Sequence, residues 1–549
     1  MPIRKALPLL LSMMLLAALP ACLPIAETAA DKDGLHHQDA ETDVIDPFRL
    51  PEPVEVTMVK SVRPDLKLPP GDTIEDNLFT RYLYDKTNVK FKILWYASGN
   101  DYDQKFNLAL ASDDLPDAMI VDEKTFRMMA KDDLLEDLTE VYDKYASPLL
   151  KEIYGATRGE ALDNATYNGK LMAIPNILPK ADSYPLVWVR KDWLDRLKLA
   201  EPRTLEDVAA IAQAFIERDP DRNGIADTIG MTGNSKAITS GGYTEAHDFK
   251  AVFNAFGAYP NIWHRDAEGK LVYGSTTPEA KQALAQVRKW YAEGLIDQDF
   301  ALRKNPFELV NRGQTGVFFA PWWAPWEIGE AVQNDPAADW RPYAIAGNDG
   351  KYHATMVPMS GNFHVVKKGF KHPEALIVNL NLQTRFGREP TEDDLQLDVT
   401  YIEMFPLMLS VEYRDAVSRK HDALMRSIRG ETAPQQLSQE MRSIYERYLR
   451  DQANPGANAG DWAPSHAYRY SGAALKRTFH EMKPLFTAST PTMEKKWAKL
   501  QKLENETFFK IVLGEEPIEA FDRFVVEWMA QGGAQILNEI EQELRGEYE

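Results

Sequence analysis

Cysteine is almost absent from this sequence. One residue of this type, Cys22, stands in 549, so no disulfide can form within the chain. Long apolar runs are also missing: the apolar stretch from Ala6 to Leu19 falls short of the ~20 residues that a membrane-spanning helix needs. The sequence has no HExxH zinc motif, no phosphate-binding P-loop, no nucleophile elbow and no visible internal repeat. These absences argue against the common metalloprotease, nucleotide-binding and esterase classes.

Positive charge is in deficit. Lys and Arg total 63 against 83 Asp and Glu, which gives a net charge of −20. Such a surface repels phosphate backbones, so a nucleic-acid partner is excluded. It also repels anionic lipid headgroups, so any attachment to a membrane would have to come from a covalent lipid. The length of the chain predicts two or more lobes rather than one core.

The N-terminus has the features of a secretory signal peptide, which we place at 1–21. Arg4 and Lys5 supply a positive start, and a short apolar segment and a small residue, Ala21, follow. The alternative is an N-terminal membrane anchor that stays uncleaved. Pro8 and Pro20, which bracket the apolar segment, favour cleavage.

The only cysteine follows this segment at once. Leu19-Pro20-Ala21-Cys22 resembles the lipobox of bacterial lipoproteins, although Pro20 departs from the usual small or hydroxyl residue. The resemblance implies lipidation of Cys22 and a location at the extracellular face of the cytoplasmic membrane. Residues 22–50 are largely polar without apolar periodicity, and we interpret them as a flexible, lipidated tether.

The pattern of the remaining chain predicts an α/β protein. Strands are expected at 54–59, 89–95, 118–121 and 186–189, with helices at 75–87 and 103–112 between them and a short helix at 192–197 after the last. This alternation is typical of a parallel sheet with helices on its faces. Helix starts are expected at Thr204, with Asp207 as a capping-box partner, and at Thr277-Pro278. Later helices are expected around 493–508 and 521–528, the second ending at 532–533, and a loop at 451–461.

Six motifs, in this order, resemble those of the extracellular solute-binding proteins (family 1 type) of carbohydrate ABC transporters, in the branch for oligosaccharide and uronide uptake. They are Leu108–Asp117 (LALASDDLPD), Tyr167–Pro175, Val187–Leu194 (VWVRKDWL), Ala292–Asp297, Gly313–Trp323 (GQTGVFFAPWW) and Leu503–Gly514.

The resemblance implies a two-lobed α/β fold of the periplasmic-binding-protein type, class II, with three interlobe crossovers forming a hinge. The crossovers are expected near 168–175, 360–366 and 486–490. Lobe one would comprise 51–169 and 362–486, lobe two 170–361, and the C-terminal helices at 487–549 would belong mostly to lobe two. The implied partners are an oligosaccharide ligand and the membrane permease subunits of the transporter, and the chain would act as a monomer.

One loop has the residues of a calcium site. Oxygen-bearing side chains alternate, and glycine stands at the sixth position, as at the start of a calcium-binding loop. The twelfth position is Gly230, where an EF-hand has Glu, and the alternative is an Asx-rich turn without metal. The resembling family has a structural Ca²⁺ at such a loop. The expected ligands are Asp219, Asp221, Asn223, Ile225 through its carbonyl group, and Asp227.

A tryptophan cluster is the main candidate for ligand binding. Trp322, Trp323 and Trp326 lie within five positions, and sugar rings pack their apolar C–H faces on flat aromatic rings. In a helix, Trp322 and Trp326 would share a face. The resembling family places a stacking tryptophan here, while the alternative is that two of the three belong to the core. Trp462 and Tyr184 are further candidates.

Arg63 is a candidate for meeting a ligand carboxylate, and a solvated arginine is the alternative. Two other functions stay open at this point: a lipoprotein that senses a solute, and a secreted carbohydrate-active enzyme whose paired carboxylates leave no motif. We expect no enzymatic activity.

Overall fold

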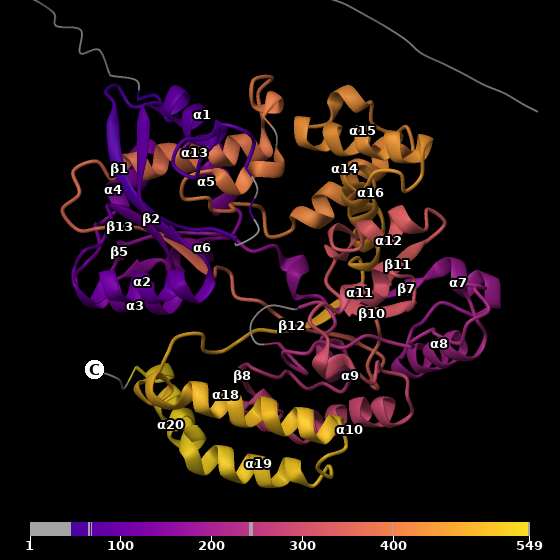
Figure 1. Ribbon diagram of the computed structural model, residues 1–549. Coiled ribbons are helices and arrows are strands. Elements are labelled where there is room, and N and C mark those ends of the chain that lie inside the picture. The colour runs from indigo at the N-terminus through magenta and orange to yellow at the C-terminus, as the bar shows by residue number, and fades with distance from the viewer. Residues whose placement is uncertain (1–44, 64–65, 67, 241–244, 398, 547–549) are drawn as a thin grey trace, which may run out of the picture. The chain divides into compact units, whose positions relative to one another are not determined.

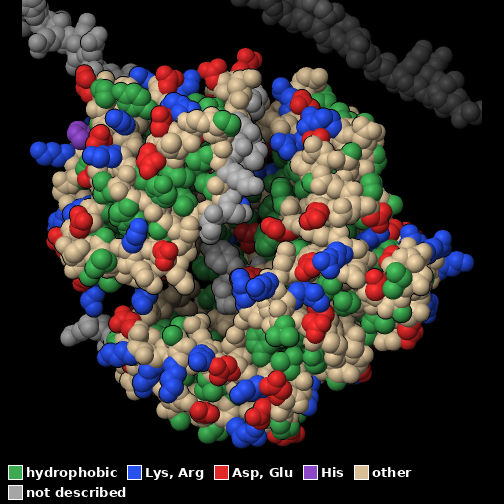
Figure 2. Space-filling view, viewed as in Figure 1, with side chains coloured by type: hydrophobic (Ala, Val, Ile, Leu, Met, Phe, Trp, Pro, Cys, Tyr) green, Lys and Arg blue, Asp and Glu red, His purple; other side chains and the backbone are tan. Residues whose placement is uncertain are grey.

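The computed structural model describes residues 45–63, 66, 68–240, 245–397 and 399–546 (Figure 1). The predicted signal peptide, Cys22 and most of the tether therefore lie outside the described residues. Among the helices within these ranges, none combines the length and the apolar character that crossing a bilayer requires. Acidic and basic side chains are interleaved over the face seen in Figure 2.

The described strands are short. They are β1 (Val54–Ser61), β2 (Val89–Ala97), β3 (Ala118–Asp122), β4 (Thr166–Tyr167), β5 (Lys170–Leu171), β6 (Ile174–Pro175), β7 (Leu186–Arg190), β8 (Trp263–Arg265), β9 (Leu271–Tyr273), β10 (Val317–Ala320), β11 (Trp340–Tyr343), β12 (Tyr352–Thr355), β13 (Asn362–Val366) and β14 (Phe479–Met482).

Helices make up most of the rest. They are α1 (Leu78–Thr87), α2 (Gly99–Ala111), α3 (Glu123–Lys131), α4 (Thr139–Tyr145), α5 (Pro148–Gly155), α6 (Glu160–Asn164), α7 (Lys191–Leu197), α8 (Leu205–Glu217), α9 (Lys250–Ala255), α10 (Pro278–Ala292), α11 (Phe307–Asn311), α12 (Gly329–Asn334), α13 (Glu374–Arg388), α14 (Ala416–Ile428), α15 (Gln439–Ala453), α16 (Ala459–His466), α17 (Gly472–Ala474), α18 (Pro491–Val512), α19 (Ala520–Trp528) and α20 (Ala534–Leu544). Two π-helical segments, Ala467–Ser471 and Met529–Gly533, follow α16 and α19.

A first hydrophobic core is built from residues 50–177 and 359–411. It contains the parallel pair β1–β2 and the antiparallel sheet β3–β13–β6. Helices α1, α4 and α5 pack against α13, whose inner side chains are almost all buried. Two chain segments more than 180 residues apart therefore share one core.

A second hydrophobic core is built from residues 187–319 and 486–540. Its sheet has the order β10–β7–β11 and is antiparallel. In Figure 1, helices α18, α19 and α20 lie side by side, and α18 also contacts α10. Two smaller clusters join residues 417–475 to the segments around Leu186, Trp322 and Trp340.

The predicted caps are present. Thr204 and Asp207 form a capping box that starts α8, and Thr277 caps α10 with Pro278 in its first turn. Side-chain oxygens there accept backbone N–H groups that a helix start otherwise leaves without partners. Local sequence therefore sets these helix starts, as expected.

The predicted parallel sheet is confirmed for β1 and β2, but not for β3 or β7, which pair antiparallel. The reason is that β3 finds its partner in β13, about 240 residues later, so alternation along the chain does not determine strand direction. The buried side chains of residues 416–475 join clusters with β7 and Trp322 and lie outside the first core.

Two details of the late helices were predicted wrongly. Gly532 and Gly533 lie in the bend between α19 and α20, where Gly532 has φ 153°, so the chain continues as helix instead of ending. The loop expected at 451–461 is shorter, since α15 runs to Ala453 and α16 begins at Ala459.

Candidate functional site

The tryptophan segment follows a strand that is buried on both faces. In β10, Phe319 packs in the second core, and Phe318 packs on the other face near Trp188 and Trp340. The chain then turns at Pro321 into a short 3₁₀ helix, Ala324–Trp326. The indole N–H of Trp188 donates to the Pro321 carbonyl at 3.2 Å. The turn is therefore fixed at its start by the sheet itself.

Trp322 is the buried member of the cluster. It is 9 % exposed, and its ring lies 5.5 Å from that of Trp326, edge to face, and 5.4 Å from that of Tyr468. The Ser471 hydroxyl donates to the Trp322 carbonyl at 2.9 Å. The expected pairing of Trp322 with Trp326 is present, although the segment is a 3₁₀ turn and not an α-helix.

A carboxylate stands beside this ring. The Trp322 indole N–H donates to Oδ1 of Asp182 at 2.7 Å. Burial raises the pKa of Asp182, while the Trp322 hydrogen bond and the charge of Arg414 lower it in part. Arg414 itself donates to the Leu178 carbonyl. The tryptophan ring therefore lies beside an oxygen acceptor, Asp182, and near a cation, Arg414. Sugar hydroxyls can donate to the first, and sugar carboxylates can pair with the second.

Trp326 and Trp323 are the accessible members. Trp326 is 45 % exposed. Trp323 is half-buried and lines a hollow of about 360 Å³. The same hollow is lined by Asn234, Glu245, His247, Lys304 and Phe307. Of the three tryptophans, these two therefore present ring surface to solvent.

The other two aromatic candidates are buried. Trp462 is 5 % exposed and stacks on His466, with ring centroids 4.4 Å apart. Tyr184 is 7 % exposed, stacks on Phe479 at 4.3 Å, and donates its hydroxyl to Glu481 at 2.8 Å. Most of the surface of both rings is therefore covered by neighbouring side chains.

Arg63 lies elsewhere, on the loop after β1. Its guanidinium makes two hydrogen bonds to the Glu403 carboxylate, at 2.9 and 2.8 Å. The side chain is 63 % exposed. A ligand carboxylate at this position would have to replace Glu403.

The predicted calcium loop has a tight, hydrogen-bonded backbone. Gly224 has φ 76°, and its N–H donates to Oδ2 of Asp219 at 3.1 Å. The Asn223 side-chain amide donates to Asp221 at 2.8 Å and to Asp227 at 3.1 Å. The side chains expected to bind Ca²⁺ are therefore brought together, while Ile225 is 61 % exposed.

The charges of this loop interact strongly. A hydrogen bond with Asp221 lowers the pKa of Asp219, whereas burial and the hydrogen bond with Asp219 raise the pKa of Asp221. Oδ1 of Asp219 is buried without a hydrogen-bond partner. An all-oxygen donor set with an unpartnered carboxylate oxygen suits a hard cation such as Ca²⁺. Within the described ranges, however, no group of three or more His, Cys, Asp or Glu is arranged to hold a metal.

Sequence reasoning missed three members of the tryptophan site. Asp182 precedes β7, Arg414 precedes α14, and Tyr468 lies in a π-helical segment. Beneath Tyr468, Lys420 pairs with both Glu412 and Glu440 at 2.7 Å. None of these residues stands in a recognisable motif, so only the fold brings them to the tryptophans.

Comparison with known proteins identifies the family to which the chain belongs. A family profile described as bacterial extracellular solute-binding protein matches residues 68–381, more than half of the chain. The chain belongs to this family, which comprises binding proteins and not enzymes.

Three relatives have names that describe them further. The fructooligosaccharide ABC transporter substrate-binding protein FusA of Streptococcus pneumoniae is 29% identical over 300 residues, 52% of this chain and 53% of that protein. Lipoprotein LipO of Bacillus subtilis is 31% identical over 42% of this chain and 44% of its own length. The polygalacturonan/rhamnogalacturonan-binding protein YtcQ of Bacillus subtilis is 24% identical over 83% of this chain and 86% of its length. The chain thus spans about half the length of the first two.

Solved structures establish the fold. FusA in complex with kestose has a TM-score of 0.61 at 19% identity and covers 90% of this chain and 99% of its own. Alginate-binding protein AlgQ2, solved without calcium ion, has a TM-score of 0.58 at 15% identity and covers 90% of this chain and 98% of its own. The predicted α/β periplasmic-binding-protein fold is confirmed, while the three crossovers and the lobe boundaries stay predictions.

Proposed function

We propose that this protein captures an oligosaccharide outside the cell by closure of its two lobes and delivers it to the permease of an ABC transporter. The observation that supports this most is the exposed Trp326 ring beside buried Trp322, whose indole holds Asp182. A flat apolar surface next to a fixed oxygen acceptor matches a sugar, which has an apolar face and hydroxyl groups at its edge.

The relatives support a carbohydrate ligand. FusA is named for fructooligosaccharides and YtcQ for polygalacturonan and rhamnogalacturonan. We propose an acidic sugar as the finer version. Lys236 and Lys304 line the hollow beside Trp323 and would meet sugar carboxylates there.

A thermal-shift screen tests the proposal. Neutral fructooligosaccharides and oligogalacturonates should be compared at equal concentration. A ligand present at 100 times its Kd adds ~2.7 kcal/mol to the free energy of unfolding. Release of shorter sugars by the purified protein would indicate an enzyme instead, and normal uptake in a deletion strain would indicate a sensor.

We propose in addition that the loop from Asp219 to Asp227 binds a structural Ca²⁺. The unpartnered Oδ1 of Asp219 supports this, as do solved relatives whose descriptions mention calcium or an EF-hand. Asp219, Asp221 and Asp227 would supply carboxylate oxygens, Ile225 its carbonyl, and Asn223 its amide oxygen after rotation of the side chain. A bound Ca²⁺ would screen the repulsion among these three carboxylates. Metal analysis of the purified protein and its melting temperature with and without EDTA test the site.

We propose finally that Cys22 carries the lipid that holds the protein at the extracellular face of the cytoplasmic membrane. The relative named Lipoprotein LipO supports this. Mass spectrometry of the N-terminal peptide tests it, since an acylated cysteine adds the mass of its fatty acids.

A further inference from the structure

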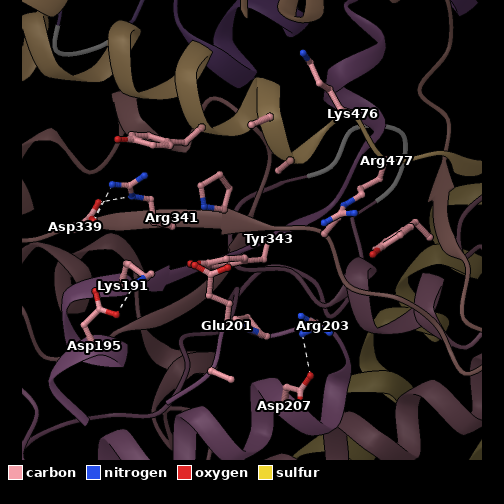
Figure 3. A pocket seen from close by; sticks show the side chains of 18 residues that line it. Lys191, Asp195, Glu201, Arg203, Asp207, Asp339, Arg341, Tyr343, Lys476 and Arg477 are labelled. Atoms are coloured by element: carbon pink, nitrogen blue, oxygen red, sulfur yellow. Dashed lines mark hydrogen bonds and ion pairs between the residues drawn. The ribbon is translucent and has the colours of Figure 1, made fainter. Parts of the chain in front are cut away.

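A second hollow shares no lining residue with the tryptophan site. Its volume is about 1310 Å³, and it lies between the start of α7, the loop before α8, strand β11 and the residues around α17 (Figure 3). Three tyrosines line it, Tyr343, Tyr352 and Tyr470. Such a concave, aromatic surface is typical of a ligand site rather than of a flat protein interface.

Most charged side chains that line this hollow already have hydrogen-bond or ion-pair partners. Asp207 accepts the backbone N–H groups of Arg203 and Thr204, at 2.9 and 3.0 Å, as the cap of α8. The other pairs are Lys191 with Asp195 at 2.5 Å, Arg341 with Asp339 at 2.5 Å, and Lys476 with Asp422 at 2.8 Å.

Two guanidinium groups differ from this rule. Arg203 and Arg477 are exposed, and no ion pair or hydrogen bond of either guanidinium occurs within the part of the chain that the structure describes. In Figure 3 both side chains border the same hollow. Arg477 lies 5.8 Å from the centroid of the Tyr352 ring. In a chain of net charge −20, two cations without carboxylate partners at one hollow need an explanation.

Arg203 is held in place by its backbone. Its N–H donates to Oδ2 of Asp207 at 2.9 Å, and its carbonyl accepts the Ala346 N–H at 2.9 Å. The tyrosine side of the hollow is held as well, because the Arg341 guanidinium lies 3.5 Å from the centroid of the Tyr470 ring. The hollow is therefore preorganised on two sides, which lowers the entropic cost of binding.

Arg477 also connects this hollow to its neighbours. A hollow of about 680 Å³ shares Tyr352, Lys476 and Arg477 with it. Another of about 280 Å³ shares Arg477 and extends to Tyr184, which belongs to the aromatic cluster of Trp322. The three hollows thus adjoin one another around Arg477 and offer room for more than one sugar ring.

We propose that this hollow is a second carbohydrate site that binds a carboxylate-bearing sugar, with Arg203 and Arg477 as the groups that hold the carboxylate. A planar guanidinium matches a carboxylate with two parallel hydrogen bonds. Tyr343 and Tyr352 offer aromatic surface for the sugar ring, and Glu201, which lies beside Tyr343 in Figure 3, offers an acceptor for a hydroxyl. This inference is independent of which sugar the tryptophan site takes.

Hydrogen exchange reports on the hollow and on the tryptophan site separately. The purified full chain is labelled with and without tetragalacturonate, with its neutral methyl ester and with inorganic phosphate as comparison probes. Protection of residues 200–207 and 472–480 reports on the hollow, whereas protection of 321–326 reports on the tryptophan site. Calorimetric titration of the same probes gives the affinities.

Arg203→Gln and Arg477→Gln are the test variants, and Arg218→Gln is the control, since Arg218 is exposed at the end of α8 and outside the hollow. Each test variant should weaken tetragalacturonate binding at the hollow about tenfold or more. The control should match the unaltered protein, and protection at 321–326 should not change in any variant.

Several outcomes would overturn the proposal. They are no protection of 200–207 by millimolar tetragalacturonate, equal protection by the methyl ester, or equal protection by phosphate. Failure of the proposed function would give a different result. Residues 321–326 would then stay unprotected with every sugar, while tetragalacturonate would still protect residues 200–207 and 472–480.

Discussion

The tryptophan site predicts that folding and binding depend on different indoles. Trp322 is 9 % exposed, contacts two aromatic rings and holds Asp182. Replacing a buried tryptophan by alanine costs about 3–5 kcal/mol of the free energy of unfolding. Trp322→Ala should reach the upper end of this range, because it also leaves the half-buried Asp182 without its donor.

Trp326 should behave in the opposite way. It is 45 % exposed, and its ring meets those of Trp322 and Tyr468 edge to face. Losing these contacts costs about 1 kcal/mol in stability. If a sugar stacks on this ring, truncating it removes an aromatic anchor, a loss of about 2 kcal/mol or more in binding, or roughly 30-fold in Kd.

Urea denaturation and calorimetric titration of the best ligand from the screen measure the two quantities on the same samples. Tyr84→Ala is the matched control, because Tyr84 is 43 % exposed and lies on α1. Trp322→Phe keeps an aromatic ring but loses the N–H: it should cost less than Trp322→Ala, about 1–3 kcal/mol in stability, through the lost Asp182 hydrogen bond and the smaller ring. The reasoning is refuted if Trp326→Ala loses 3 kcal/mol of stability while the folded fraction binds sugar normally.

Three further predictions concern the rest of the chain. Removing Ca²⁺ with EDTA should lower the melting temperature and added Ca²⁺ should restore it, whereas Asp221→Asn should abolish the response; an EDTA-insensitive melting curve would mean that the loop is only a turn. Burial raises the pKa of Glu504 to about 7 from its ordinary 4.5, so the folded state keeps a proton that the unfolded state releases, and stability should fall by about 3 kcal/mol as pH rises from 4.5 to above 7. Glu504→Gln should remove that part of the pH dependence, measured by denaturant titrations at pH 5 and 8. An equal change in the free energy of unfolding between the two pH values in both proteins would contradict the assignment. Cys22→Ala should release the protein from membranes in a fractionation assay, and continued retention would point to an uncleaved anchor.

Local features of the fold were accessible from the sequence. The strands β1, β2, β3 and β7 were placed within a few residues, because runs of buried apolar side chains leave a clear pattern. The caps at Thr204 and Thr277 were placed because they depend on neighbours in sequence. Strand direction was not accessible, since it depends on partners far along the chain.

For the candidate site too, the sequence predicts the features that depend on neighbouring residues but not those that depend on distant ones. The tryptophans were visible as a cluster, and proximity in sequence brought Trp322 and Trp326 into contact even without an α-helix. Which of them is exposed was not visible. That depends on Tyr468 and Asp182, which lie some 140 residues away in either direction and contact Trp322 only after folding.

The strand before the tryptophans explains how one segment would serve both folding and the proposed binding. Phe318 and Phe319 are neighbours in β10, and alternation sends their side chains to opposite faces, each into a different buried cluster. A strand anchored on both faces has little freedom, and the Trp188 and Ser471 hydrogen bonds extend this restraint to the backbone at Pro321 and Trp322. The exposed ring of Trp326 is therefore presented from a rigid base. Because a preordered ring loses little entropy on contact with a ligand, most of its stacking energy remains for affinity.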